Sequence, residues 1–372
     1  MIYLDNASTT YIYPEVKEAI IEELDFFGNP SNLYNIGYKQ FEKVEIARKK
    51  IAKAINCDPE EIFFTSGSSE GNAWALSQSE KCLCSAYEHH NISNNPKSIK
   101  IDEDYLDRCI QSNWNMQSYY ENVYSKFCCS HMLVNNETGE IFNVNKFFEK
   151  AKHFKMFTHC DMTQALGNLK IDMSKYENID MATFSGHKIH GPKGIGFCYV
   201  NDKYLSRLKP MIYGGIQESG KRAGTENVPY IVGLGIAVEK ACSDAKLKWI
   251  HCQDLRNRCL NILFESGLKE NEDFVINEGA ENIPSTLNIA FKGIEGEVLM
   301  LAMQDRNIIV GTGSACNSGD MEPSEVLKEM RVPEDFIHGA IRLSFDLSNK
   351  LEDVNFAMEE LIKIYKSLTG KY

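Results

Sequence analysis

Residues 181–200 read MATFSGHKIHGPKGIGFCYV. Their two apolar runs, Met181–Ser185 and Ile195–Val200, predict strands, and the turn-forming residues between them include Lys188 and Lys193. A lysine at a strand end among small residues is poorly explained as a solvated surface charge. In a partly dry pocket it loses affinity for its proton and can form a Schiff base with an aldehyde. The alternative is an ordinary β-turn with both lysines exposed.

The apolar runs on either side repeat this pattern. Further strands are predicted at Glu61–Thr65, Cys82–Ala86, Cys128–Val134 and Met156–Asp161, with another near Ser98–Ile101 that a helix follows. Amphipathic helices are predicted over Pro14–Phe27 and along Phe41, Val44, Ala47, Ile51 and Ile55. This alternation predicts an α/β fold with a large, mostly parallel sheet and helices on both faces. In such sheets ligands bind beyond the carboxyl ends of the strands.

The pattern changes after about Val228. Helices are predicted over Val228–Lys246 and Trp249–Ser266, followed by a strand at Ser285–Phe291 and a helix–strand–helix tail. We therefore expect a large domain over residues 14–235, and a smaller α/β C-terminal domain that also includes residues 1–13 and spans 236–372.

The composition limits the choice of partners. The chain has 372 residues, with 40 Lys and Arg against 52 Asp and Glu, and a net charge of −12. Such a surface repels phosphates, so neither nucleic-acid binding nor anionic-membrane binding is expected. No apolar run has membrane-spanning length, so we expect a cytoplasmic protein. The 12 cysteines are too sparse for a disulfide-rich secreted domain and form no pair of Cys-x-x-Cys knuckles, so we expect no disulfides. No metal is expected at His159, Cys160 and Asp161, because alternate strand residues face opposite sides.

A Schiff-base lysine implies an aldehyde cofactor, and pyridoxal 5'-phosphate makes three further demands. Its phosphate needs backbone N–H groups at a helix start, which the small-residue turn at 66–71 supplies. Its ring nitrogen needs a carboxylate, and Asp161 ends a strand with Gln164 three residues further on. Its ring needs a stacking partner, and His89 follows another strand. Each feature also has an ordinary structural explanation: the turn can cap a helix, Asp161 can be a helix N-cap, and His89 can be a structural residue. Only their occurrence together favours the cofactor.

Two further residues stand out. Cys316 lies in GTGSACNSGD, residues 311–320, a small and polar setting that suits a travelling nucleophile better than a packing thiol. The alternative is a flexible loop with an incidental thiol. Arg342 lies inside the apolar run Ala340–Phe345, where a guanidinium needs an anion. A substrate carboxylate is one candidate anion, and an internal Asp or Glu is the other.

Together these residues resemble the cysteine desulfurases, pyridoxal-phosphate enzymes of the class V aminotransferase group with the aminotransferase-like fold type I. The similarity runs from YLDNASTT at residues 3–10 to IRLS at 341–344, and the Cys316 loop resembles that of the long-loop branch. The resemblance implies catalytic roles for Cys316, Lys188 and His89. It implies cofactor contacts at Lys188, Asp161, Gln164, His89, Ser68, Ser69, Ser185, His187 and Thr225, and substrate contacts at Arg342, Asn136 and Asn29.

The resemblance also implies a reaction and partners. L-cysteine is converted to L-alanine, and its sulfur passes to Cys316 as a persulfide for delivery to a sulfur-acceptor protein, either an iron–sulfur scaffold or a tRNA-thiolation protein. The stretch RAGTE at 222–226 resembles one that brings a threonine to the neighbouring subunit's phosphate, which implies a homodimer. Gly311 and Thr312 depart from the family, which tends to have two serines there. The alternatives are selenocysteine lyase or another β-lyase of this group, and a cofactor-binding scaffold with weak activity.

Overall fold

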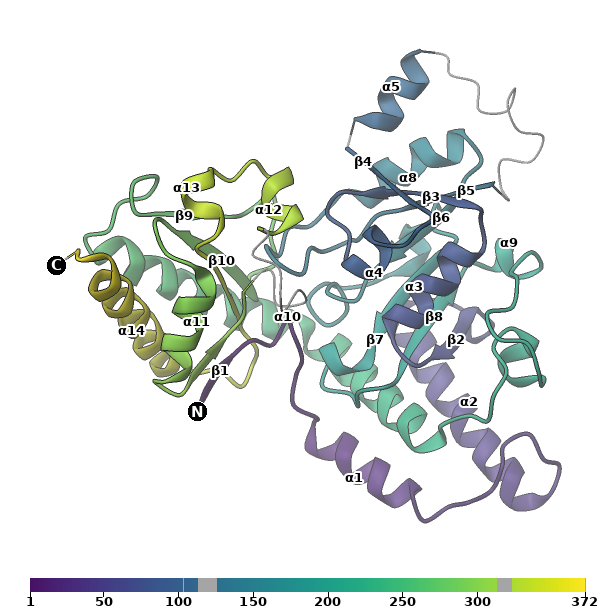
Figure 1. Cartoon of the computed structure of the whole chain (residues 1–372). Coiled ribbons are helices and arrows are strands. Elements are labelled where there is room, and N and C mark those ends of the chain that lie inside the picture. The colour runs from purple at the N-terminus through teal and green to yellow at the C-terminus, as the bar shows by residue number, and fades with distance from the viewer. Residues whose placement is uncertain (103, 113–125, 313–322, 372) are drawn as a thin grey trace. The chain divides into compact units, whose positions relative to one another are not determined.

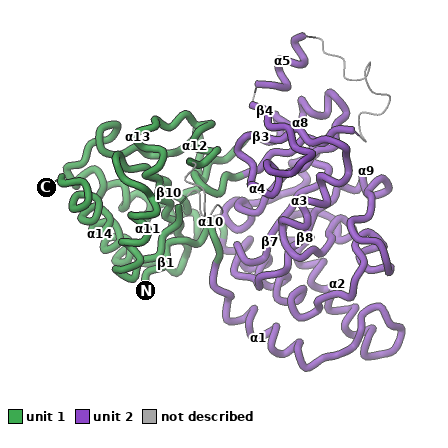
Figure 2. The backbone as a smooth tube through the Cα atoms, in the orientation of Figure 1, with its two compact units in different colours: residues 1–9, 134–142, 245–372 green, residues 10–133, 143–244 purple. Residues whose placement is uncertain are grey.

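The computed structural model describes residues 1–102, 104–112, 126–312 and 323–371, which form two compact units (Figure 2). Unit 1 consists of residues 1–9, 134–142 and 245–372, and unit 2 of residues 10–133 and 143–244. The elements, labelled in Figure 1, are β1 (Ile2–Leu4), α1 (Pro14–Glu23), α2 (Asn35–Ile55), η1 (Pro59–Glu61), β2 (Ile62–Thr65), α3 (Ser68–Ser77), β3 (Lys81–Ser85), α4 (His90–Ser93), β4 (Ser98–Ile101), α5 (Tyr105–Gln111), β5 (Phe127–Ser130), α8 (Val144–His153), β6 (Phe157–Asp161), η2 (Met173–Lys175), β7 (Met181–Ser185), η3 (Gly186–Lys188), β8 (Gly196–Val200), α9 (Asp202–Leu205), η4 (Gln217–Gly220), α10 (Val228–Glu265), β9 (Phe274–Ile276), β10 (Thr286–Phe291), α11 (Gly296–Gln304), β11 (Ile308–Val310), α12 (Glu325–Glu329), α13 (Glu334–Ile337), β12 (Ala340–Ser344) and α14 (Leu351–Thr369).

Unit 2 is built on a seven-stranded sheet with the order β2-β8-β7-β6-β5-β3-β4. Strands β4, β3, β5, β6 and β7 pair in parallel, and β8 is antiparallel to both of its neighbours. Strands β5 to β8 are buried along almost their whole length, which explains why they read as apolar runs rather than alternating ones. The predicted α/β architecture with a large, mostly parallel sheet is confirmed.

Helix α3 covers the middle of this sheet (Figure 1). Trp74 on α3 is fully buried and meets Phe63 of β2 edge to face, with 5.7 Å between the ring centroids. Gly196 of β8 lets the turn before α3 approach closely, because a Cβ there would lie 2.8 Å from the Gly67 Cα. The start of α3 is therefore held against the sheet.

Unit 1 has a small core between two short sheets and its helices. Strands β12, β10 and β9 form an antiparallel sheet, and β1 pairs in parallel with β11. Leu4, Phe291, Leu343 and Tyr365 are buried in one apolar cluster with side chains from α10, α11 and α14. The first residues of the chain thus belong to the C-terminal unit.

Several predicted boundaries are wrong. Val228–Glu265 is one continuous 38-residue helix rather than two, because Leu247 and Lys248 at the predicted break are neither glycine nor proline. The strand predicted over residues 128–134 ends at Ser130, although the N–H groups of His131 and Leu133 still donate to carbonyls at the end of β6. Phe41 is 45% exposed, unlike its predicted partners on the buried face of α2.

The two units group the chain differently from the predicted domain ranges. Residues 134–142 fall in unit 1, to which they are joined by hydrogen bonds from Ile141 N to Glu281 O and from Ile283 N to Gly139 O. The division within α10 falls after Asp244, and residues 10–13 belong to unit 2. Within the described residues, no helix combines the length and the apolar character needed to cross a membrane.

Candidate active site

The predicted cofactor residues of unit 2 follow strands that run in the same direction. Lys188 follows β7, Asp161 ends β6, His89 follows β3 and Ser68 follows β2. Strand β2 runs parallel to β7, because both are antiparallel to β8 between them. The carboxyl ends of these strands lie at one edge of the sheet, where ligands bind in this class of fold.

The Asp161 carboxylate is buried and firmly oriented. Its Oδ2 accepts a hydrogen bond from Asn72 Nδ2 at 2.8 Å, and its Oδ1 accepts one from the Thr163 N–H at 2.9 Å. The Thr163 hydroxyl, two residues further on, is buried without a hydrogen-bond partner among the described residues. Such an orphaned polar atom beside a carboxylate is typical of a site that holds a polar ligand.

Lys188 is half-buried and closes the short helix η3. Beside it, the pKa of His187 is lowered to about 4, mainly by burial and further by the charges of Lys188 and Lys193. His187 is therefore neutral at pH 7 and offers an anion a hydrogen bond rather than a charge.

Ser185 and the start of α3 form a small cradle. The φ of Gly67 is +152°, and a Cβ added there would lie 3.7 Å from the Ser185 Oγ. Ser68 and Ser69 follow as the first residues of α3, whose leading N–H groups have no partners within the helix. This donor set suits a phosphate.

His89 has a defined ring orientation. Its Nδ1 accepts a hydrogen bond from the Asn91 N–H at 3.2 Å, so the proton of the neutral ring is on Nε2. The ring of His89 can therefore donate from Nε2 toward a ligand.

Gln164 is half-buried, and its backbone carbonyl accepts a hydrogen bond from Asn168 Nδ2.

In unit 1, Arg342 has an internal partner. Its Nη2 lies 2.7 Å from Asp5 Oδ1, and its Nη1 donates to the Asn136 carbonyl at 2.7 Å. Its Nε is buried and makes no hydrogen bond in the described structure. Gly311 lies against this pair, because a Cβ added there would lie 2.6 Å from Asp5 Oδ1 and 2.9 Å from the Arg342 Nη2.

Thr225 lies on an exposed loop that is anchored at two points. Arg222 pairs with Glu70 of α3 at 2.8 Å, and Arg48 of α2 pairs with Glu218 at 2.8 Å. Glu218 and Ser219 have left-handed backbone angles, with φ values of 47° and 55°. These ion pairs hold the loop against α2 and α3.

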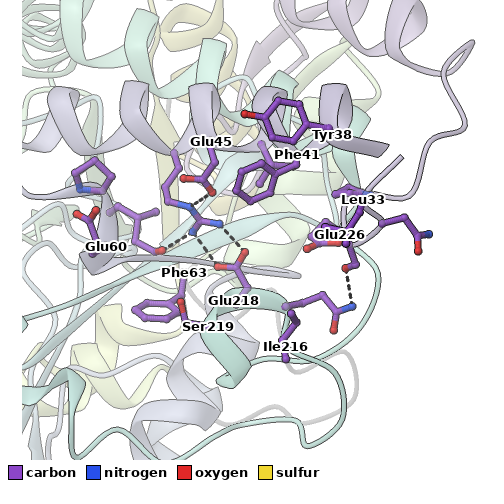
Figure 3. Close-up of a pocket in the computed structure, with 18 residues that line it drawn as sticks. Leu33, Tyr38, Phe41, Glu45, Glu60, Phe63, Ile216, Glu218, Ser219 and Glu226 are labelled. Carbon is purple, nitrogen blue, oxygen red and sulfur yellow. Dashed lines mark hydrogen bonds and ion pairs between the residues drawn. The ribbon is translucent and has the colours of Figure 1, made fainter. Parts of the chain in front are cut away.

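A cavity of about 560 Å³ opens beside the second anchor (Figure 3). Leu33, Tyr38, Phe41 and Ile216 are exposed large apolar side chains on its wall. Asn29, a predicted substrate contact, precedes this wall, where its Oδ1 accepts a hydrogen bond from the Ser31 N–H at 2.9 Å. None of the predicted cofactor residues lines the cavity.

Cys316 lies outside the described residues. The cysteines within them are mostly buried, and burial raises the pKa of Cys84, Cys242 and Cys252 to about 12. These thiols stay protonated at pH 7 and are poor nucleophiles.

Several polar residues of the site were not predicted. Asn72, which orients Asp161, lies on α3, while Ser130 and Thr183 lie inside buried strands that read as apolar. The only signal in the sequence is a small polar residue in the middle of an apolar run. His159, considered only as a metal ligand, uses both ring nitrogens for hydrogen bonds to Ser130 and Thr183.

Comparison with known proteins agrees with this architecture. Residues 2–356 match the class V aminotransferase family, and the chain therefore belongs to that family.

Its relatives within the family are named cysteine desulfurases, as the resemblance in the sequence predicted. The chain is 35% identical to cysteine desulfurase IscS of Methanosarcina thermophila, over 99% of this chain and 92% of that protein. It is 36% identical to the cysteine desulfurase of Trichormus azollae, over 99% and 94%.

Solved structures give the same result. A NifS-like protein from Rickettsia africae has a TM-score of 0.85 at 28% identity, covering 98% of this chain and 99% of that one. SspA in complex with cysteine has a TM-score of 0.74 at 29% identity, covering 93% and 99%. The predicted fold type I is confirmed.

Proposed function

We propose that the protein is a cysteine desulfurase that uses pyridoxal 5'-phosphate. Overall, L-cysteine and the thiol of Cys316 give L-alanine and a persulfide on Cys316, so that every atom of the substrate is accounted for. The observation that carries the proposal is the fixed Asp161 carboxylate at the end of β6, the strand next to β7, which Lys188 follows. The names of the relatives, and the cysteine bound to SspA, support the choice of substrate.

The residues of unit 2 fit this cofactor. Lys188 would hold its aldehyde carbon, and Asp161 would pair with the ring nitrogen. The cradle at Gly67, with Ser68, Ser69, Ser185 and His187, would hold the phosphate, and the orphaned Thr163 hydroxyl and the Gln164 side chain would face the ring region. When bound, the cofactor supplies an electron sink that stabilises negative charge at the substrate Cα.

The remaining roles belong to side chains of the protein. The Nζ of Lys188 would take up and return the Cα proton, and the Nε2–H of His89 would donate a hydrogen bond to the bound ligand. Arg342, with Asn136 and Asn29, binds the substrate carboxylate. The Cys316 thiolate receives the substrate sulfur, because the thiolate is the nucleophilic form.

Lys188→Ala tests the cofactor assignment. The purified wild-type protein should be yellow when loaded, and the variant should lose that absorption band. Lys193→Ala, in the same turn, is the matched control and should keep the band. A Lys188→Ala protein with the wild-type spectrum would refute the assignment.

We further propose a homodimer that contacts through the wall containing Leu33 and Ile216, with Thr225 reaching the partner's phosphate site. The exposed apolar side chains around the cavity and the anchored Thr225 loop support this arrangement. Leu33→Asp combined with Ile216→Asp should shift the protein to monomers in light scattering, and a dimer of unchanged stability would contradict the proposed face. The sulfur acceptor is a partner protein, either an iron–sulfur scaffold or a tRNA-thiolation protein.

A further inference from the structure

A chain of hydrogen bonds runs through unit 2 from Asp161 to Glu88. Its six side chains, each at most 7% exposed, are Asp161, Asn72, Thr183, His159, Ser130 and Glu88. The successive contacts measure 2.8, 2.5, 3.2, 2.8 and 2.8 Å. Because each link needs one donor and one acceptor, the chain determines where its protons are.

The Asp161 end fixes the first links. Both Asp161 oxygens accept N–H hydrogen bonds, so the Asn72 amide must present its Nδ2 to Asp161 and its Oδ1 to Thr183. Thr183 has a single hydroxyl proton, and it donates that proton to Asn72. The Thr183 oxygen can therefore only accept from His159, which must carry a proton on Nε2.

The Glu88 end is then constrained. The Ser130 hydroxyl lies 2.8 Å from both His159 Nδ1 and Glu88 Oε1, and it too has one proton. If Ser130 donates to His159, Glu88 must donate to Ser130 and is a neutral acid. If Ser130 donates to Glu88, His159 must be a doubly protonated cation.

We propose that Glu88 is an un-ionised carboxylic acid in the folded protein, which donates its proton to Ser130 and holds His159 as the neutral Nε2–H tautomer. The alternative ion pair would bury two charges away from water, and burial penalises each of them. Glu88 Oε2 is buried and accepts no hydrogen bond from the described residues, which a neutral carbonyl oxygen tolerates better than an anionic one.

The electrostatic surroundings agree with this assignment. Burial, followed by the charge of Asp161, raises the pKa of Glu88 to about 8, while burial lowers the pKa of His159 to about 4. An ionised Glu88 would accept hydrogen bonds from the Ser130 hydroxyl and the His89 backbone N–H and would be attracted by His131, but these effects do not cancel the rise in the pKa of Glu88. The remaining titratable neighbours, Cys84 and Cys160, are thiols whose own pKa values are raised by burial.

A neutral Glu88 acts as a positioning residue. It keeps a second buried negative charge away from the Asp161 carboxylate, and it holds the His159 ring, on the same strand β6, in one tautomer and orientation. Any effect of Glu88 on how Asp161 pairs with the ring nitrogen of a cofactor rests on the proposed function. The protonation states of Glu88 and His159 do not depend on that function.

Isotope-edited infrared spectroscopy of the full-length protein labelled with ¹³C-glutamate tests the proposal. At pH 7 the carbonyl bands of un-ionised glutamic acids should shift with the label, and the component that belongs to Glu88 should disappear in Glu88→Gln. A pKa of about 8 corresponds to about a tenfold excess of acid over carboxylate at that pH. Glu137→Gln is the matched control, because Glu137 is buried in unit 1 with a pKa raised to about 7, and its loss should leave the Glu88 band in place.

A second measurement observes His159 directly. Nitrogen NMR of ¹⁵N-histidine-labelled protein should show the His159 ring as neutral, with its proton on Nε2. Ser130→Ala should change the Nδ1 signal of that ring, because Nδ1 loses its donor, whereas Glu88→Gln should preserve it through the amide N–H. A doubly protonated His159 ring, or an acid band at pH 7 that loses nothing in Glu88→Gln, would overturn the proposal. A protein that fails to desulfurate cysteine but keeps both signatures would contradict only the proposed function.

Discussion

At the scale of single residues, Arg342 combines a structural contact with a proposed binding role. Asp5 supplies the anion that a buried guanidinium needs, while the Nε of Arg342 makes no hydrogen bond to any residue that the structure describes. Asp5 is the internal anion that the sequence allowed as a partner of Arg342. The Nε–H of Arg342 can still donate to the other candidate, a substrate carboxylate.

Replacing Arg342 should separate these roles. Arg342→Ala leaves Asp5 without its partner, so we expect a loss of about 3 kcal/mol in the free energy of unfolding. The KM for cysteine should rise roughly tenfold or more, which corresponds to about 1.4 kcal/mol of lost binding. Urea unfolding and steady-state kinetics measure the two effects.

Asp5→Asn is the control for that substitution. It breaks the same ion pair but keeps the guanidinium, so it should cost stability while leaving the KM unchanged or lower. If both variants raised the KM equally, Arg342 would not be the substrate carboxylate's partner.

At the scale of elements, the turn between β2 and α3 carries the proposed phosphate site. Gly67 has a positive φ that side chains rarely adopt, and its neighbours are Ser185 and the first residues of α3. Gly67→Ala should cost about 1 kcal/mol of stability through backbone strain. It should also weaken cofactor binding, measured by titrating the cofactor-free protein with pyridoxal 5'-phosphate.

Gly267→Ala offers a matched comparison. Its φ of +83° is also one that side chains rarely adopt, nothing lies within 4 Å of the added Cβ, and it belongs to unit 1. Gly267→Ala should also lose stability, but with unchanged cofactor affinity. Equal affinities for Gly67→Ala and Gly267→Ala would argue against a phosphate at the start of α3.

Much of this element-level arrangement could be predicted from the sequence, for physical reasons. Lys188, Asp161 and His89 each follow an apolar run, and the carboxyl ends of parallel strands form one edge of the sheet. The Asp5–Arg342 pair could not be predicted, because its members are 337 residues apart and meet only through tertiary packing. The hydrogen-bond chain was missed for a different reason, since Ser130 and Thr183 are small polar residues within runs whose dominant signal is apolar.

At the scale of the whole molecule, the side chains with shifted pKa values predict how the free energy of unfolding depends on pH. Glu88 and Glu137 have folded pKa values of about 8 and about 7, above their ordinary 4.5. The folded protein therefore keeps protons that the unfolded chain releases, and the associated stability is lost as the pH rises through 7 and 8. His159 and His187 have folded pKa values of about 4 against their ordinary 6.5, so the unfolded chain binds more protons at these residues. They add an opposite trend, which fades as the pH rises above 7.

The melting temperature should accordingly fall between pH 6.5 and 8. Each carboxyl contributes a slope of up to about 1.4 kcal/mol per pH unit in the free energy of unfolding. Glu88→Gln and Glu137→Gln should each flatten the fall, and their combination should remove most of it. A melting temperature that rises over this range in the wild type would show that both carboxyls are ionised in the folded state.

The central claim is that the chain moves sulfur from cysteine to its own Cys316. The most direct test is a single turnover with L-cysteine in the absence of reductant, followed by quantification of alanine and mass spectrometry of the peptide that contains Cys316. We expect one alanine for each Cys316 peptide that gains the mass of one sulfur atom, and neither product from Lys188→Ala. Alanine formed without added sulfur on that peptide, or no alanine from fully loaded wild-type protein, would contradict it.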